Sequence, residues 1–355
     1  MVLNEAKRAI NEDKLGYTNA LGILPLRQAI AKHYLDKYNV KISPDQVLIT
    51  TGSSAAFLFT FLGCFDPQDC IALCSSGYPC YRNLMKATNL NAVSIPVNSE
   101  YKVTAKELLL MIKERSLKNL PPLKGLILSS PSNPTGAMLT PDELKELTDL
   151  CKVQNILFIS DEIYHGISYG STPEASALQF SSSSCIVINS FSKYYSMTGW
   201  RLGWMVVPLS LVDTMNRLSQ NMYINAPTLS QIAACKAFDC NKQLDSYVNM
   251  YKVNREIVLE ALQELGLLSG AAPADGAFYI YIDLQAAGVT DSMQLCHRLL
   301  EEAGVALTPG VDFEDPENGL GLKRIRFCYA RSTEDVREGM RRFKIWWAEN
   351  MVAKD

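Results

Sequence analysis

The sequence predicts an α/β fold in which helices cover a mostly parallel β-sheet. Short apolar runs with strand character, such as residues 47–50, 125–128 and 156–160, alternate with helical patterns. The helical patterns begin with capping signals, as at Thr140, which precedes a proline and an aspartate. This alternation is typical of parallel sheets, because each crossing between parallel strands usually runs through a helix.

The composition allows two domains and gives no sign of a nucleic-acid or membrane partner. The chain has 355 residues, of which 48% are hydrophobic, and a net charge of −3. We expect a large domain over residues 1–243 and a small domain over residues 244–355, which includes a linking helix at about residues 242–265. The charge shows no basic excess, and no run is apolar and long enough to cross a bilayer. A cytoplasmic location is the default expectation.

The cysteines and histidines do not indicate disulfide, metal or histidine-based chemistry. The 10 cysteines include no Cys-x-x-Cys pair and lie in apolar strand or helix contexts, so we expect reduced thiols in the core. His33, His165 and His297 are the only histidines, and they are scattered along the chain. Neither a metal site nor a histidine triad is supported.

The first polar motif follows the strand-like run at residues 47–50. Gly52 makes a turn there, and Ser53 and Ser54 open a helical pattern. The first amides of a helix have no partner inside it, so they and the two hydroxyls can face an incoming phosphate. By itself the motif is equally consistent with an ordinary helix cap.

Two further motifs follow strand-like runs later in the chain. Asn133 lies in a Ser-Asn-Pro-Thr-Gly segment after residues 125–128, and Asp161 and Tyr164 close the run at residues 156–160. Ligands of open α/β sheets bind at the carboxyl ends of the strands, so these side chains are placed for binding. Taken singly, Asn133 could be a turn residue and Asp161 a helix cap.

The most informative motif surrounds Lys193. Two hydroxyls, Ser190 and Ser192, lie just upstream and Arg201 lies downstream. A desolvated lysine amine can condense with an aldehyde to a Schiff base, while hydroxyls and a guanidinium can hold a dianionic phosphate. Pyridoxal phosphate carries both groups. Taken alone, the segment could be an ordinary serine-rich loop. The upstream motifs occur in a fixed order and at strand ends, which favours the interpretation as a cofactor site.

These motifs resemble those of the fold-type I pyridoxal-phosphate enzymes, specifically the class I/II aminotransferases of the aspartate aminotransferase superfamily. The family's Ser-x-x-Lys and Gly-x-Arg-x-Gly match residues 190–193 and 199–203, its Asn-Pro-Thr-Gly matches residues 133–136, and its Asp-x-x-Tyr matches Asp161 and Tyr164. The resemblance runs from about residue 3 to the carboxyl terminus. It implies a seven-stranded sheet in the large domain and a smaller α+β carboxyl-terminal domain.

The resemblance also implies a role for each matched residue. Lys193 would be the Schiff-base lysine, Asp161 the partner of the pyridine nitrogen, and Tyr164 and Asn133 the partners of the ring oxygen. A carboxylate at the pyridine nitrogen keeps it protonated, and the freed lysine is then the natural general base and acid. The phosphate would be held by backbone and side-chain groups of Gly52, Ser53, Ser54, Ser190 and Arg201.

Two tyrosines nearer the amino terminus match weaker family elements. Tyr17, before a helical pattern at residues 24–38, corresponds to a tyrosine that reaches the phosphate of a neighbouring subunit, which implies a homodimer. Tyr78 corresponds to the aromatic residue that stacks on the cofactor ring, with Tyr81 as its rival and core packing as the alternative for both. The family usually has proline where Ser76 stands.

Near the carboxyl end, residues 323–330 alternate charged and apolar side chains as a strand does. Arg326 matches the family arginine that binds the substrate α-carboxylate, together with Asn133, through a bidentate guanidinium. Arg324 is expected on the surface. Residues 275–280 resemble the glycine-led strand of the family's small domain, and we interpret them as structural.

The amino terminus departs from the family pattern. Met1 opens inside a helical pattern at residues 2–13, whereas the resembled enzymes have some tens of earlier residues that close over the substrate. The sequence is therefore expected to be either a fragment or a variant with a more open pocket.

The resemblance implies amino acid and 2-oxo acid substrates. Dicarboxylate-specific members use an arginine shortly before a Tyr-x-Asn element, and residues 219–225 lack it at the matching position, although Arg217 is close. Strict aspartate specificity is disfavoured, which leaves aromatic, alanine-type or broad neutral amino acids. A lyase or decarboxylase with the same cofactor contacts, and a non-catalytic or truncated paralogue, remain alternatives.

Overall fold

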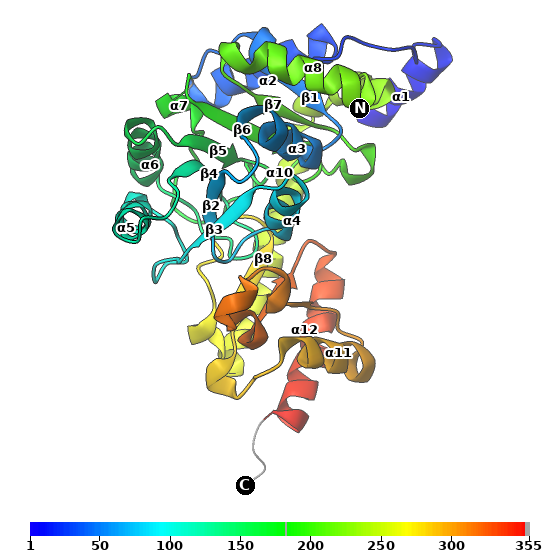
Figure 1. Ribbon diagram of the computed structural model, residues 1–355. Helices are drawn as coiled ribbons and strands as arrows, with labels where there is room; N and C mark the ends of the chain where they lie inside the picture. The colour runs from blue at the N-terminus through cyan, green and yellow to red at the C-terminus, as the bar shows by residue number, and fades with distance from the viewer. Residues whose placement is uncertain (182, 352–355) are drawn as a thin grey trace.

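The computed structural model describes residues 1–181 and 183–351, and it confirms the α/β class (Figure 1). A seven-stranded sheet has the order β1-β7-β6-β5-β4-β2-β3. Strand β7 is antiparallel to both of its neighbours, and the other pairs are parallel. The strands are β1 (Val47–Thr50), β2 (Cys70–Cys74), β3 (Asn91–Ile95), β4 (Leu123–Ser129), β5 (Leu157–Asp161), β6 (Cys185–Ser190) and β7 (Gly203–Val206).

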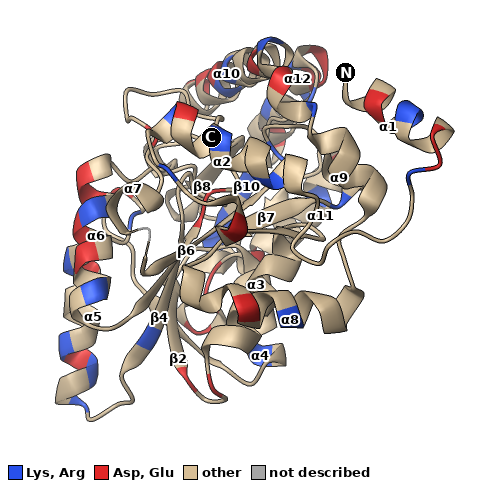
Figure 2. Cartoon of the chain, turned by 90° about the horizontal axis from the view of Figure 1, so that it is seen from above, with Lys and Arg blue, Asp and Glu red and all other residues tan. Residues whose placement is uncertain are grey.

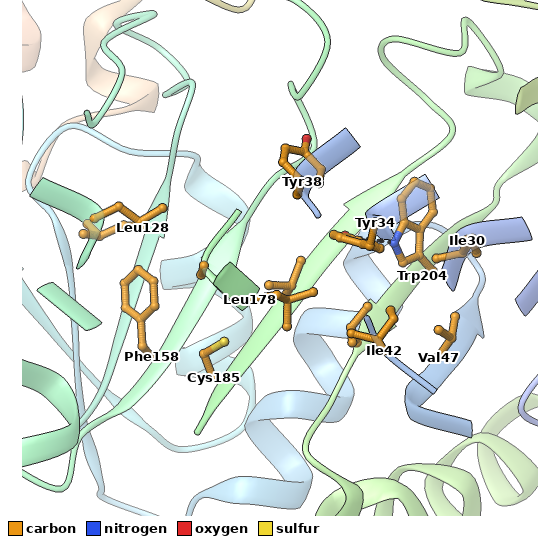
Figure 3. Packing of buried hydrophobic residues seen from close by; sticks show 14 of the residues in the cluster. Ile30, Tyr34, Tyr38, Ile42, Val47, Leu128, Phe158, Leu178, Cys185 and Trp204 are labelled. Atoms are coloured by element: carbon orange, nitrogen blue, oxygen red, sulfur yellow. Dashed lines mark hydrogen bonds between the residues drawn. The ribbon is translucent and has the colours of Figure 1, made fainter. Parts of the chain in front are cut away.

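Helices cover both faces of this sheet because its central strands are apolar on both sides. Along β6, Val187 faces one core while Ile186 and Ile188 face the other, as a period of two requires. The first core is closed by residues of α2, α6 and α7, and Figure 3 shows Trp204 beside Tyr34 within it. The second core is closed by α3, α4 and α8. The large-domain helices are α1 (Val2–Asn11), α2 (Leu24–Tyr38), α3 (Ser53–Cys64), α4 (Pro79–Ala87), α5 (Ala105–Leu117), α6 (Pro141–Val153), α7 (Leu178–Ser181), α8 (Val212–Tyr223) and α9 (Thr228–Ala234).

Helix α6 begins where the capping signal predicts. The Thr140 hydroxyl accepts a hydrogen bond from the Glu143 amide at 3.2 Å, and the Glu143 carboxylate accepts one from the Thr140 amide at 2.7 Å. This reciprocal pair satisfies two amides that have no partner inside the helix. Figure 2 shows that α5 and α6 carry both signs of charge along their lengths.

The long helix α10 (Asn241–Glu264) connects the large domain to a second, smaller core. Leu244 packs in the first core of the large domain, whereas Val258 and Leu262 pack in the small-domain core. The predicted division between residues 243 and 244 therefore falls in the first turn of this helix. The small domain contains the antiparallel sheet β8-β10-β9 and two helices: β8 (Tyr279–Asp283), β9 (Thr308–Pro309), β10 (Arg324–Cys328), α11 (Ser292–Ala303) and α12 (Thr333–Asn350).

Two sequence-based expectations need correction. Cys70, Cys151, Cys185 and Cys296 are buried, but Cys328 is exposed, so the prediction that the thiols lie in the core is wrong for Cys328. All 10 cysteines are free. Arg324 was expected on the surface, but it is largely buried and pairs with two carboxylates.

Within the described part of the chain, no helix combines the length and the hydropathy that crossing a membrane requires.

Candidate active site

The carboxyl ends of β4, β5 and β6 meet at a cavity of about 280 Å³ between the large and small domains. This placement follows from the parallel pairing of the three strands, which brings the segments after them to one edge of the sheet. The cavity is lined by these sequence-predicted residues: Ser53, Ser54, Tyr78, Asn133, Asp161, Tyr164, Lys193, Arg201 and Arg326.

Lys193 follows β6 and is half-buried in the cavity. Its Nζ lies 5.7 Å from the ring centroids of both Tyr164 and Phe278, and it makes no ion pair or hydrogen bond with any described residue. Burial lowers the pKa of this amine. A desolvated amine is more readily deprotonated, and the deprotonated amine is the form that attacks a carbonyl.

Asp161, at the end of β5, is only 3% exposed and forms no ion pair with any described residue. Its Oδ1 accepts a hydrogen bond from the Ile163 amide at 3.1 Å, and its Oδ2 accepts one from the Tyr81 hydroxyl. Burial raises the pKa of this carboxyl to about 6, while the two hydrogen bonds oppose that rise. A buried carboxylate without a cation is suited to receive a cationic N–H donor.

Tyr81 also lines the cavity, and its hydroxyl donates a hydrogen bond to Asp161. It is 3% exposed, and its ring meets that of Tyr78 edge-on, with centroids 5.6 Å apart. Tyr78 is the more exposed of the two, at 37%. This arrangement leaves Tyr78 as the candidate for stacking and gives Tyr81 a role that the sequence analysis did not assign.

Tyr164 and Asn133 present polar groups to the same cavity. The Tyr164 hydroxyl is 2.9 Å from that of Tyr279, and Oδ1 of Asn133 accepts a hydrogen bond from Nη1 of Arg326 at 2.8 Å. The amide nitrogen of Asn133 makes no hydrogen bond to a described residue, so it remains free to donate. Residues 275–280, interpreted as structural, also contribute Tyr279 to the cavity lining.

The turn between β1 and α3 forms a compact anion cradle. Gly52 caps α3 with a positive φ of 75°, where a side chain is strained, and a Cβ there would lie 2.8 Å from Nη2 of Arg201. A Cβ at Gly203 would lie 2.8 Å from the Ser53 amide nitrogen. The two glycines therefore let the guanidinium and the free amides of the helix start come together, an arrangement that fits a phosphate.

Three of the residues predicted to contact the cofactor, Gly52, Ser190 and Tyr17, are not among those that line the cavity of this chain. Ser190 is 1% exposed; its hydroxyl contacts the Leu202 carbonyl oxygen and accepts from the Ser192 amide, both at 3.1 Å. Ser192, the second of the two hydroxyls upstream of Lys193, lines the cavity. Tyr17 lies between α1 and α2 and is 83% exposed.

Arg326, on β10, is held between two aromatic rings. Its Cζ lies 4.1 Å from the ring centroid of Tyr279 and 4.5 Å from that of Phe313, and Nη2 is 3.3 Å from the Thr308 hydroxyl. Its buried Nε has no hydrogen-bond partner. A buried donor without a partner is costly, so this edge of the guanidinium is suited to an acceptor such as a carboxylate.

Comparison with known proteins identifies the class of protein that this fold and cavity define. A family model described as "Aminotransferase class I and II" matches residues 1–343, so the chain belongs to that family. It is a pyridoxal-phosphate-dependent aminotransferase, which confirms the predictions of fold, cofactor and reaction.

The similarity to individual relatives covers almost the whole chain. The chain is 41% identical to a valine–pyruvate aminotransferase of Mycobacterium tuberculosis, over 96% of this chain and 86% of the relative. It is 33% identical to a (5-formylfuran-3-yl)methyl phosphate transaminase of Methanocaldococcus jannaschii, over 97% of this chain and 86% of the relative. A crystal structure of an aminotransferase from Mycobacterium tuberculosis superposes with a TM-score of 0.92 at 40% identity, covering 98% and 88% of the two chains.

Proposed function

We propose that this aminotransferase holds pyridoxal phosphate through Lys193 and takes its amino group from an amino acid with a neutral side chain. The supporting observation is the number of cations in the cavity. Of its lining residues, only Lys193, Arg201 and Arg326 are cationic. If they serve the cofactor aldehyde, the phosphate and the substrate α-carboxylate, no cation of the lining remains for a second carboxylate.

The same pocket offers a partner for each polar group of the cofactor. We assign the phosphate to Ser53, Ser54, Ser192 and Arg201. Ser190 is assigned to hold Ser192 in place through the hydrogen bond from the Ser192 amide to its hydroxyl. We assign the ring nitrogen to Asp161 and the ring oxygen to Tyr164 and Asn133. Tyr78 is assigned to the ring face. When bound, pyridoxal phosphate supplies an aldehyde that takes up amino groups and a ring that accepts an electron pair from the substrate α-carbon.

Lys193 is proposed to move the proton. Once its Nζ no longer holds the cofactor, Lys193 is a free amine with a lowered pKa. It can then accept the proton of the substrate α-carbon and donate that proton to a carbon atom of the cofactor. The apolar rings of Tyr164 and Phe278, each 5.7 Å from this amine, exclude part of the water around it. The charge on Asp161 stabilises the protonated ring nitrogen, which favours release of that proton.

Arg326 is proposed to fix the substrate. Two rings hold the guanidinium plane, and Asn133 occupies only one of its nitrogens through a 2.8 Å bond. The unpartnered Nε leaves an edge that can meet a carboxylate and so orient the α-carbon.

We also infer a homodimer whose interface includes the amino-terminal segment. Helix α1 packs against α9 and buries Ala6 and Ala9, but other apolar side chains on it and on the following loop are exposed. Leu3 is 66% exposed, Ile10 is 51% and Tyr17 is 83%. A second copy covering this surface would bury them and could bring Tyr17 to the phosphate of the neighbouring cavity.

A panel of single-turnover reactions tests the substrate proposal. The protein loaded with pyridoxal phosphate is mixed with valine, alanine, phenylalanine, aspartate or glutamate, and the released 2-oxo acid is counted per subunit. We expect one equivalent from a neutral amino acid, with no ammonia or carbon dioxide, and a return of the amino group to pyruvate. A faster reaction with aspartate than with every neutral donor would contradict the proposal.

A further inference from the structure

One loop of the small domain docks onto the large domain beside the cavity. This docking loop, residues 313–315, follows a short 3-10 helix at Gly310–Asp312. The carbonyl oxygen of Phe313 accepts hydrogen bonds from the Gly77 amide at 3.0 Å and from Nη1 of Arg82 at 3.1 Å. Farther out, the Ser94 hydroxyl donates to Oδ2 of Asp315 at 2.6 Å.

Glu314 is the buried centre of this junction. It is 1% exposed, and its Oε1 accepts from Nη1 of Arg324 at 2.8 Å and from the Tyr281 hydroxyl at 2.9 Å, both within the small domain. The third donor is the Ser76 hydroxyl, at 2.6 Å, from the large domain. Ser76 is fully buried. The carboxylate is therefore fixed to its own domain by two bonds and to the other domain by one short bond.

Phe313, the residue before Glu314, packs against Arg326 of the cavity. The Phe313 ring centroid lies 4.5 Å from Cζ of Arg326, and the Tyr279 ring centroid lies 4.1 Å from the same atom. A shift of the docking loop would move the Phe313 ring away from Arg326, and the guanidinium plane would then be free to rotate. A guanidinium that can rotate loses much of its ability to present two nitrogens to a carboxylate, because the orientation must then be fixed on binding.

The residues after Ser76 reach the opposite wall of the cavity. Tyr78 caps α4, and Tyr81, one helical turn on, donates to Asp161. Ser76 thus begins the segment that carries both tyrosines. The hydrogen bond between Ser76 and Glu314 is therefore one of the contacts that connect the wall proposed to hold the cofactor ring with the wall proposed to hold the substrate.

We propose that Glu314, through its hydrogen bond from Ser76, is a positioning residue that keeps Phe313 against Arg326 and so prepares the guanidinium for the substrate carboxylate. The proposal rests on the proposed function, in which Arg326 binds that carboxylate. It assigns no contact with substrate to Glu314 or Ser76.

Ser76→Ala in the loaded enzyme is the central test. The variant removes one hydrogen bond between the domains and leaves Glu314 with its two donors inside the small domain, so folding should be preserved. We expect KM for the amino acid to rise about tenfold, the size of one hydrogen bond to a charged group, with kcat changed less than about twofold. Hydrogen exchange at Gly77 and through the docking loop should become faster in the same variant.

Ser176→Ala is the matched control. The Ser176 hydroxyl donates to buried Glu162 at 2.8 Å, so this variant loses a bond of the same kind wholly inside the large domain. It should lower the melting temperature without moving KM or the exchange of the docking loop. Phe313→Leu, which removes the ring but keeps the apolar volume, should reproduce the rise in KM.

The outcomes separate this proposal from the proposed function. If the wild type releases no 2-oxo acid, or if Arg326→Ala leaves KM unchanged, the proposed function fails and the positioning role fails with it. If Arg326→Ala raises KM while Ser76→Ala behaves like Ser176→Ala, only the positioning role is overturned. Faster exchange in Ser76→Ala with an unchanged KM would show a bond between the domains that does not position Arg326, which also overturns it.

Discussion

The two walls of the cavity are built in different ways. On the large-domain wall, Asp161 is the last residue of one strand, and Asn133 and Lys193 follow its two parallel neighbours by a few residues. On the small-domain wall, Arg326 gains its orientation from Tyr279 on a neighbouring strand and from Phe313 on a loop. On the first wall, each side chain is placed by the strand next to it in the sequence, and the order of the strands in the sheet brings these side chains together. The second depends on packing between distant segments, so its geometry should be easier to disturb without loss of the fold.

The largest effect should come from the large-domain wall, at Lys193. Lys193→Ala should lose turnover completely and should abolish the borohydride-stable attachment of pyridoxal phosphate to the chain, because no other amine of the cavity lining can form the bond. Peptide mapping of the reduced protein measures this. Lys193→Arg is the matched control, which keeps the charge but cannot form the bond. Label on a different lysine in the wild type would refute the assignment.

Asp161→Asn should retain the cofactor and lower kcat by roughly a thousandfold, equivalent to about 4 kcal/mol of barrier. The substitution keeps the shape of the side chain but removes the charge that favours a protonated ring nitrogen. Cofactor content and single-turnover rates measured on the same sample separate the two effects. Loss of cofactor with unchanged turnover per bound cofactor would make Asp161 only a structural residue.

On the small-domain wall, Arg326→Ala should weaken capture of every amino acid alike, by about 2 to 5 kcal/mol in kcat/KM. Removing one member of a buried charge pair leaves the substrate carboxylate without its partner. Attachment of pyridoxal phosphate to Lys193 should be unchanged. An effect confined to one class of amino acid would indicate that Arg326 binds the substrate side chain instead of the α-carboxylate.

The smallest effect concerns Tyr81, which belongs to the large-domain wall in space but not to its sequence motifs. Tyr81→Phe removes a donor that favours the charged form of Asp161, so the pKa of Asp161 should rise further. We expect kcat to fall about tenfold, the size of one hydrogen bond to a charged group. The acidic limb of the pH profile of kcat should move to higher pH. Tyr78→Phe is the control, and a limb that moves in neither variant would contradict this role.

The same contrast explains what could be predicted from the sequence. The fold class, the helix start at Thr140 and the strand-end positions of Asn133 and Asp161 follow from patterns only a few residues long. The bond from Tyr81 to Asp161 spans 80 positions, and that from Ser76 to Glu314 spans 238. Nothing local marks these pairs, because only the folded chain brings them together. Ser190 was predicted from its motif, but burial turns its hydroxyl inward and leaves Ser192 at the surface of the cavity.

Finally, the buried Asp161 carboxylate affects stability as well as chemistry. Its pKa is 3.8 when free and about 6 in the fold, so the folded chain without cofactor binds a proton more tightly than the unfolded chain. The contribution of Asp161 to the free energy of unfolding is therefore highest below pH 3.8. It falls by roughly 3 kcal/mol as the pH rises through 6. The apoprotein of Asp161→Asn should therefore melt at a higher temperature than the wild-type apoprotein at pH 8, and the difference should shrink toward pH 4. A positively charged ring nitrogen bound at this carboxylate would remove the cost, so the cofactor is expected to act as a folding ligand whose stabilising effect grows as the pH rises from 3.8 through about 6.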